Sequence, residues 1–248
     1  MGYREKNPKR VKKGFSVVES MLSMFFFLLI VLFSLECFIA TKKHFNQLQR
    51  SETSNTAAYA ALDRMRRDVE EAGMGLKELM TMGVLEGISQ DQNELVILSK
   101  QEELPVIEDI VSGQQRIAVA NTRNIKIGQQ ICIFNSGNGE MRSVISTTRD
   151  SILLDLPFDD EYPQERTKLL ILRRLSLFFD ESAEIIRRKV NTSPAQPLLE
   201  EVASFGYEFS EDSNLVRFHF GLNMEEEKDY ETTVFPKNMA LSITRQGI

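Results

Sequence analysis

The sequence predicts an α+β fold in which one long N-terminal helix packs on an antiparallel β-rich domain. Two observations lead to this prediction. Between Phe15 and Ala72 the chain of 248 residues contains neither glycine nor proline, the residues that most often end a helix. Beyond residue 90, short apolar runs alternate with turn residues, which is typical of antiparallel strands. The length allows a membrane segment plus one sizeable domain or two small ones.

The first part of the predicted helix, residues 15–40, is predominantly apolar and carries only two charged side chains, Glu19 and Glu36. About 20 apolar residues span a bilayer as a helix, so this segment is long enough to be transmembrane. At 1.5 Å per residue the whole stretch without glycine or proline would reach roughly 87 Å, far more than a bilayer is thick. We therefore expect the helix to continue outside the membrane, through residues 41–75.

The continuation has an apolar stripe. After the polar "SETSNT" (51–56), where we expect a kink or fraying, apolar residues recur at spacings of three and four: Ala58, Leu62, Met65, Val69 and Ala72. The other side carries charges: Asp63, Arg64, Arg67, Glu70 and Glu71. The stripe is most simply the face that the helix lays on a sheet.

The remainder, residues 76–248, is predicted to be β-rich. Several apolar runs alternate with period two, and the intervals contain turn sequences such as "NSGNGE" and "SEDSN". Residues 106–158, bounded by Pro105 and Pro157, are expected to form a compact β insertion. The predicted strands include 94–99, 116–120, 130–134, 142–146, 151–156 and 168–175, followed by "LSLFF", "EIIRRK", "FGYEFS", "LVRFHFGL" and "TTVF".

Charge is distributed unevenly along the chain. Residues 1–14 carry a net charge of +5 and the whole chain −6, so residues 15–248 carry −11. A basic head before an apolar segment fits the positive-inside arrangement, with the head cytoplasmic and the acidic body across the membrane. An acidic body also argues against a nucleic-acid-binding surface.

The junction between the basic head and the apolar run is distinctive. Gly14 supplies a small residue that would suit a protease acting before the run, and Glu19 is then the fifth residue of a chain that begins at Phe15. The new amine of Phe15 is a cation that can pair with the Glu19 carboxylate, in its own chain or in a neighbour, and pairing makes a buried charge tolerable. The simpler alternative is an uncleaved signal anchor, since no A-x-A-like site follows the run.

The stretch "KKGFSVVES" and the apolar run after it resemble the class III signal of type IV pilins and of the pseudopilins of type II secretion. The resemblance implies a pilin-like fold and cleavage after Gly14 by a prepilin peptidase. It also implies methylation of Phe15 and a role for Glu19 in assembly. The expected functional site therefore consists of Gly14 and Phe15 for processing and Glu19 for assembly.

The stretch "ALDRMRRDVEEAGMG" (61–75) is similar to the end of this helix in PilW-type minor pilins and the related J-type pseudopilins. Their L-R-x-D-x-x-x-A-G pattern is matched by Arg66, Asp68, Ala72 and Gly73, with Met65 in place of the leucine. Later pieces, among them "LRRLSLFFD" (172–180) and "PKNMAL" (236–241), also look PilW-like. In the last piece Lys237 stands where an arginine is usual.

Residues that would carry chemistry are sparse. His44, His219 and Cys132 have no metal-ligand spacing around them, and no phosphate-binding loop, G-x-S-x-G or H-E-x-x-H is present. We therefore expect neither an enzyme nor a cofactor. Oxygen-rich loops can hold calcium, but one acidic cluster lacks the spacing of an EF-hand, and a solvated loop is the alternative: Asp155, Asp159, Asp160 and Glu161.

The resemblance implies a structural minor pilin or pseudopilin. Its location would be the bacterial inner membrane, single-pass, with the C-terminal domain in the periplasm, and then a fibre. The implied partners are a prepilin peptidase, other minor pilins, the major pilin and the inner-membrane assembly platform. A type IV pilus, a type II secretion pseudopilus and a DNA-uptake fibre remain open. The alternative function is an uncleaved, membrane-anchored periplasmic binding or sensing domain.

Overall fold

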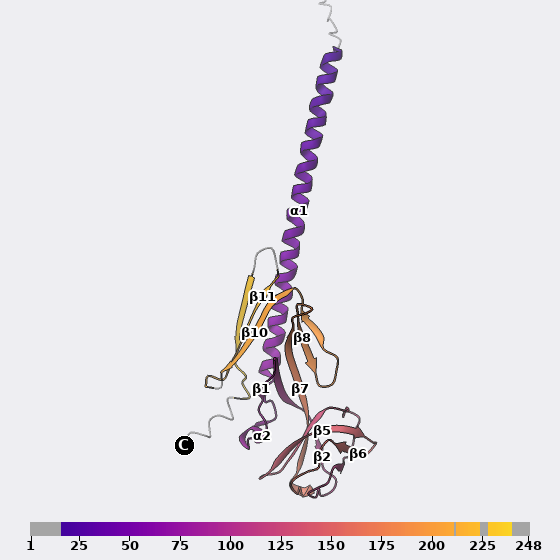
Figure 1. The fold of residues 1–248 in the computed structure, drawn as a ribbon, viewed down its shortest axis with the longest axis vertical. Coiled ribbons are helices and arrows are strands. Elements are labelled where there is room, and N and C mark those ends of the chain that lie inside the picture. Colours follow the sequence, from indigo (N-terminus) through magenta and orange to yellow (C-terminus); the bar gives the residue numbers. More distant parts are fainter. Residues whose placement is uncertain (1–15, 211, 224–227, 240–248) are drawn as a thin grey trace, which may run out of the picture. The chain divides into compact units, whose positions relative to one another are not determined.

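The computed structural model describes residues 16–210, 212–223 and 228–239 (Figure 1). The helix α1 (Val17–Glu70) has 54 residues, and the chain divides into two compact units between Ser54 and Asn55. The first unit contains the N-terminal part of α1. The second contains its C-terminal turns and all strands. The α+β layout, a long apolar N-terminal helix followed by an antiparallel β-rich domain, is therefore confirmed.

The end of α1 differs slightly from the expectation. "SETSNT" is helical, and the boundary between the two units falls within it. The helix ends at Glu70, two residues before Ala72, and a turn follows. Gly73 closes this turn with φ +70°, and its N–H donates to the carbonyl oxygen of Leu98 at 2.8 Å. Glycine adopts this left-handed conformation without strain, so it suits the end of the helix.

The larger sheet has nine antiparallel strands in the order β1-β2-β7-β4-β5-β6-β3, with β8 on β7 and β9 on β8. The strands are β1 (Ile88–Asp91), β2 (Glu94–Pro105), β3 (Arg116–Ala118), β4 (Gln130–Phe134), β5 (Gly139–Thr147), β6 (Ser151–Leu154), β7 (Lys168–Asp180), β8 (Ile185–Val190) and β9 (Gln196–Leu199). A second sheet has the order β10-β11-β12: β10 (Val202–Ser210), β11 (Leu215–Leu222) and β12 (Lys228–Val234). The short helices are α2 (Lys77–Thr81) and η1 (Gln164–Arg166).

The strand β7 has different partners on its two edges. Along one edge it pairs with β2 from Lys168 to Phe178. On the other edge, residues 168–171 pair with β4 and residues 175–180 pair with β8. Residues 172–174 pair with neither strand, so the sheet divides there, and we call this division the fork. The runs predicted as two strands, 168–175 and "LSLFF", belong to this one strand.

Two main cores lie on either side of the fork. The helix core packs the C-terminal turns of α1 between the second sheet and the β7–β8 part of the larger one (Figure 1). On α1 it buries Ala58, Ala61, Met65 and Val69, while Leu62 is only partly buried. The lobe core fills the space among β3 to β6. It also takes Leu104 from β2 and Leu169 and Ile171 from β7, so the expected insertion 106–158 shares its core with the strands that flank it.

Candidate functional site

The N-terminal part of α1 buries nothing within its own unit. Every side chain from Ser16 to Asn46 is exposed, and the large apolar ones between Val17 and Leu48 are 45% to 76% exposed. In the described part of the chain, α1 is the helix that is long and apolar enough to cross a membrane. An apolar surface of this extent is unfavourable in water, so the segment suits a membrane anchor.

The carboxylate of Glu19 lies in the first turn of α1 and caps it. The backbone N–H of Ser16 donates to Glu19 Oε2 at 3.3 Å, and Ser16 Oγ accepts from the N–H of Val18 at 3.3 Å. This reciprocal arrangement is that of a capping box, which satisfies N–H groups that have no partner within the helix. Negative charge is also favourable at a helix N-terminus. Gly14 and Phe15, the expected processing residues, lie outside the described residues.

The other end of α1 is held by a buried ion pair. Asp68 is 2% exposed and accepts from Arg188 of β8 at 2.7 and 2.9 Å, in a bidentate contact. Arg64 and Arg173 lie at 3.6 and 3.8 Å from the same carboxylate. The hydrogen bonds that the Arg188 guanidinium donates to Asp68 raise the pKa of Arg188, although burial opposes this shift. The pair fixes the rotation of α1 against β8, because a buried charge without its partner is costly.

The partnership of Asp68 with Arg188 is not among the contacts predicted from the sequence. Asp68 lies three residues after Met65 and four before Ala72, so it falls on the apolar stripe rather than on the charged side. A carboxylate at such a position requires a buried cation, and this signal could have been used. The other residues of the helix-end pattern have simpler surroundings: Arg66 pairs with Glu70 at 3.1 Å on the surface, and Ala72 is buried.

The four calcium candidates do not converge. Asp155 accepts hydrogen bonds from the backbone N–H groups of Ser143 and Leu156, both at 2.9 Å. Asp159 pairs with Arg142 at 3.0 Å. Asp160 donates its backbone N–H to Glu140 at 2.9 Å, and Glu161 is exposed. Within the described ranges, no group of three or more histidine, cysteine or carboxylate side chains is placed to hold a metal ion.

Glu140 organises this acidic loop. It is 9% exposed and accepts from the backbone N–H groups of Asp159 and Asp160 and from the hydroxyl of Tyr162 at 3.0 Å. Arg142 donates to the same carboxylate. Burial, followed by the hydrogen bond to Glu140, raises the pKa of Tyr162. The role of Glu140 is not predicted from the sequence, because nothing in its position within a strand marks it.

Known proteins similar to this chain are limited to partial structural matches. No protein-family model matches the sequence, and the search of curated proteins gives no match. Partial matches to solved structures include the Gp54 tailspike of Acinetobacter baumannii bacteriophage AP22, solved with a capsular saccharide. That match has 19% identity and a TM-score of 0.28, and it covers 31% of this chain and 15% of that one.

Two further partial matches are the tailspike gp61 of Pseudomonas phage phi297 and the tailspike gp49 of Pseudomonas phage LKA1. Their identities are 15% and 18%, and both TM-scores are 0.27. They cover 29% and 31% of this chain, and each match spans 14% of the tailspike. Similarity at this level supports no conclusion about fold or function.

Proposed function

We propose that this chain is a minor pilin or pseudopilin, a structural subunit with no catalysis of its own. After cleavage behind Gly14 by a prepilin peptidase, it enters a type IV pilus or a type II secretion pseudopilus near the tip, or primes assembly of the fibre. Before assembly it resides in the bacterial inner membrane by a single span, with its C-terminal domain in the periplasm. Its partners are the inner-membrane assembly platform, other minor pilins and the major pilin.

The observation that carries this proposal is the position of Glu19. It is a carboxylate in the first turn of a helix whose next 16 residues are uncharged and exposed, directly behind the Gly14–Phe15 junction. Ionisable residues within membrane segments are rare and are usually paired, so a carboxylate at the start of this apolar run points to a partner. Oε2 accepts from Ser16, while Oε1 has no hydrogen bond among the described residues. Oε1 is therefore available to a cation, and the amine of Phe15 on a neighbouring subunit would supply one.

Intact-mass measurement of the membrane-extracted protein tests the proposal. Co-expression with a prepilin peptidase should remove residues 1–14 and leave a methylated Phe15. Gly14→Val should block cleavage, whereas Gly2→Val, a matched change within the basic head, should not. A full-length mass in the presence of an active peptidase would contradict the proposal and favour the alternative, an uncleaved membrane-anchored binding or sensing domain.

A further inference from the structure

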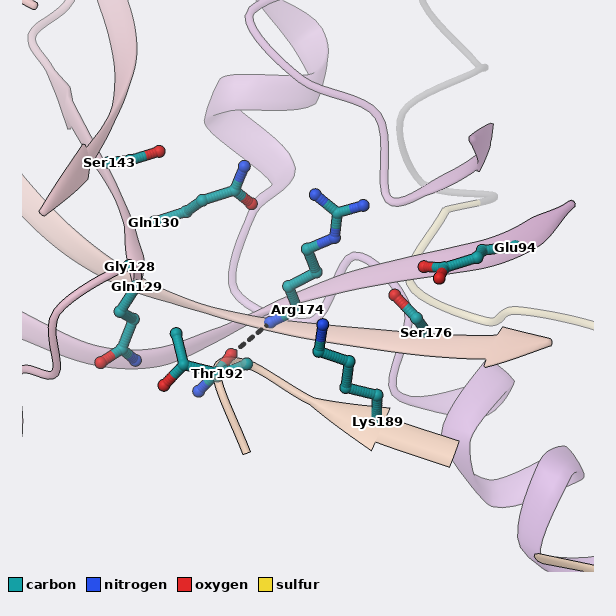
Figure 2. Close-up of a pocket in the computed structure, with 10 residues that line it drawn as sticks. Glu94, Gly128, Gln129, Gln130, Ser143, Arg174, Ser176, Lys189 and Thr192 are labelled. Atoms are coloured by element: carbon teal, nitrogen blue, oxygen red, sulfur yellow. Dashed lines mark hydrogen bonds between the residues drawn. The ribbon is translucent and has the colours of Figure 1, made fainter. Parts of the chain in front are cut away.

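A polar hollow of about 450 Å³ lies at the fork of the larger sheet (Figure 2). Its floor is the face of the sheet turned away from α1, where Arg174 and Ser176 of β7 lie beside Glu94 of β2 and Lys189 of β8. Alternate side chains of a strand point to opposite faces, and the neighbours Arg173 and Leu175 face α1. The hollow belongs wholly to the second compact unit.

Two hydrogen-bonded segments replace the missing strand partner and form the walls. Asn191, at φ +49°, accepts from the N–H of Arg174 through its side chain at 2.8 Å and donates its own N–H to the Arg174 carbonyl at 2.7 Å. On the other side, Gln129 is 2% exposed and donates to Gln101 at 2.7 Å and to the Leu172 carbonyl at 3.3 Å. Both walls are therefore fixed before any ligand arrives.

The walls touch at Gly128 and Thr192. Gly128 has φ +80°, and a Cβ at this position would lie 2.9 Å from Cγ2 of Thr192. Only glycine fits this contact without displacement. The shape of the hollow is thus set by packing as well as by hydrogen bonds.

Several polar groups that face the hollow have no partner. Ser176 is 4% exposed, yet its hydroxyl makes no hydrogen bond among the described residues. The ammonium of Lys189 makes no ion pair there, and neither does the Glu94 carboxylate. Figure 2 shows these groups with the Gln130 amide and the Ser143 hydroxyl around one space. The Ser176 hydroxyl lines the hollow, so it is placed to contact a ligand there together with Lys189 and Glu94.

The charges limit what the partner can be. Arg174 donates to Asp91 at 2.9 Å through Nη2, which leaves its Nε and Nη1 donors free of that contact. Asp91 already compensates Arg174, and Glu94 shares the hollow with Lys189. The Lys189 ammonium is therefore the cation that an anionic ligand can pair with, which suits a singly charged group better than a phosphate dianion. None of the lining residues is aromatic or large and aliphatic, so an apolar ligand or a stacked ring gains little.

We propose that the hollow at the fork binds a small organic carboxylate that carries hydroxyl groups. The carboxylate lies between Lys189 and Arg174, in charge-assisted hydrogen bonds. Ser176, Gln130 and Ser143 receive the hydroxyls, and Glu94 accepts from one of them. The volume is within the range of small-molecule sites, roughly 300–1,000 Å³, and exceeds what an inorganic anion fills. The site is independent of the membrane helix and of its processing.

Ligand-observed NMR titration of the full-length protein in detergent micelles tests the proposal. The probes are D-glucuronate, the neutral D-glucose and inorganic phosphate. We expect saturable binding of glucuronate, at least tenfold tighter than that of glucose or phosphate. Lys189→Gln should weaken it about tenfold or more, because it removes one charge-assisted contact. Ser176→Ala, a change too small to disturb the fold, should weaken it several-fold.

Lys77→Gln is the matched control, since it removes an exposed lysine far from the fork in sequence and outside the hollow, and it should bind like the parent. Binding that is equal for glucuronate and glucose overturns the proposal of an anion site. Unchanged affinity in both Lys189→Gln and Ser176→Ala overturns its location. No saturable binding of glucuronate at millimolar concentrations overturns the ligand class.

Discussion

At the scale of single residues, Glu19 has two possible partners with different consequences. The cap with Ser16 uses Oε2 and would stabilise the first turn of one helix. Pairing with the amine of a neighbouring Phe15 would use the charge. Glu19→Gln keeps the shape and a hydrogen-bonding oxygen but removes the charge. We expect this variant to insert in the membrane and to be cleaved after Gly14, yet not to support fibre formation, as measured by counting fibres at matched expression.

Glu36 offers the matched control for this experiment. It is the other carboxylate of the apolar stretch, it is exposed, and no described side chain pairs with it. Glu36→Gln removes the same charge from the same segment and should leave fibre formation intact. Normal assembly of the Glu19→Gln subunit would show that the carboxylate is needed as a cap and not as a charge.

Cys132 gives a second prediction at this scale. It is fully buried in β4, and burial, followed by the negative charge of Glu140, raises its pKa to about 12. At pH 8 roughly one such thiol in ten thousand is ionised, and the thiolate is the reactive form. In a Cys37→Ser background, iodoacetamide should label Cys132 only after denaturation, as seen by mass spectrometry. Rapid labelling of the folded protein would mean that β4 opens easily.

At the scale of elements, the contact between α1 and β8 depends on Asp68 and Arg188. Asp68→Asn leaves the guanidinium of Arg188, whose side chain is only 12% exposed, without its counter-charge, which we expect to cost about 3–5 kcal/mol of unfolding free energy. The measurement is urea denaturation followed by circular dichroism. Asp63→Asn, which breaks the exposed pair of Asp63 with Arg67, should cost only about 0.3–0.5 kcal/mol. Equal effects of the two substitutions would show that the Asp68 pair does not secure the helix.

The contact between Gly128 and Thr192 makes a prediction for the fork. Gly128→Ala combines a strained φ with a clash against the Thr192 methyl group, whereas Gly113→Ala meets φ +84° in open space. We expect each variant to lose about 1–3 kcal/mol of unfolding free energy because alanine is strained at a positive φ, and Gly128→Ala to lose more because of the clash. Thr192→Ser removes the methyl group. In this background Gly128→Ala should lose no more unfolding free energy than Gly113→Ala, and a double-mutant cycle measures this coupling. Absence of this coupling would show that a side chain at residue 128 does not clash with the Thr192 methyl group.

At the scale of the whole molecule, the boundary between the two units predicts a separable domain. Residues 51–248 should fold as a monomer, since all of the helix core and lobe core lies beyond Asn55. Met65→Asp places an unpaired charge in the helix core and should abolish cooperative melting. Met74→Asp, at a side chain that is 45% exposed, should melt like the parent. Cooperative melting of the Met65→Asp fragment would mean that α1 contributes little to the core.

The sequence predicts the layers of this molecule better than its connections. The absence of glycine and proline between Phe15 and Ala72 predicts the helix, and period-two alternation predicts most strands, because both signals are local. The fork is not predictable in this way. Whether β7 pairs with β4 or β8 depends on contacts between distant segments, and two runs that look like separate strands join into one. Leu62, expected on the buried stripe, is only partly buried and packs at the edge of the helix core, whereas Ala61 is buried, since the spacing of apolar residues shows a face but not its centre.

The candidate sites show the same limit. The Glu19 position follows from a short motif, although the residues before Ser16 lie outside the described part of the chain. Asp68 could be suspected from its place on the apolar stripe, but Arg188 lies 120 residues away and nothing local selects it. The hollow collects ordinary glutamate, glutamine, serine, arginine and lysine side chains from β2, β4, β5, β7 and β8, and no motif marks them.

The two long strands also determine how the molecule carries tension. Both β2 and β7 run from the helix core into the lobe core, so two covalent chains join the cores. A strand already rises about 3.3 Å per residue, close to the greatest length that a peptide can reach. A pull along these strands therefore meets two nearly extended chains, and the bulge in β2 between Lys100 and Glu102 is the extra length that it can draw out before the pairing with β7 breaks. In the fibre subunit proposed above, a force applied to the lobe core would pass along these two strands to the helix core.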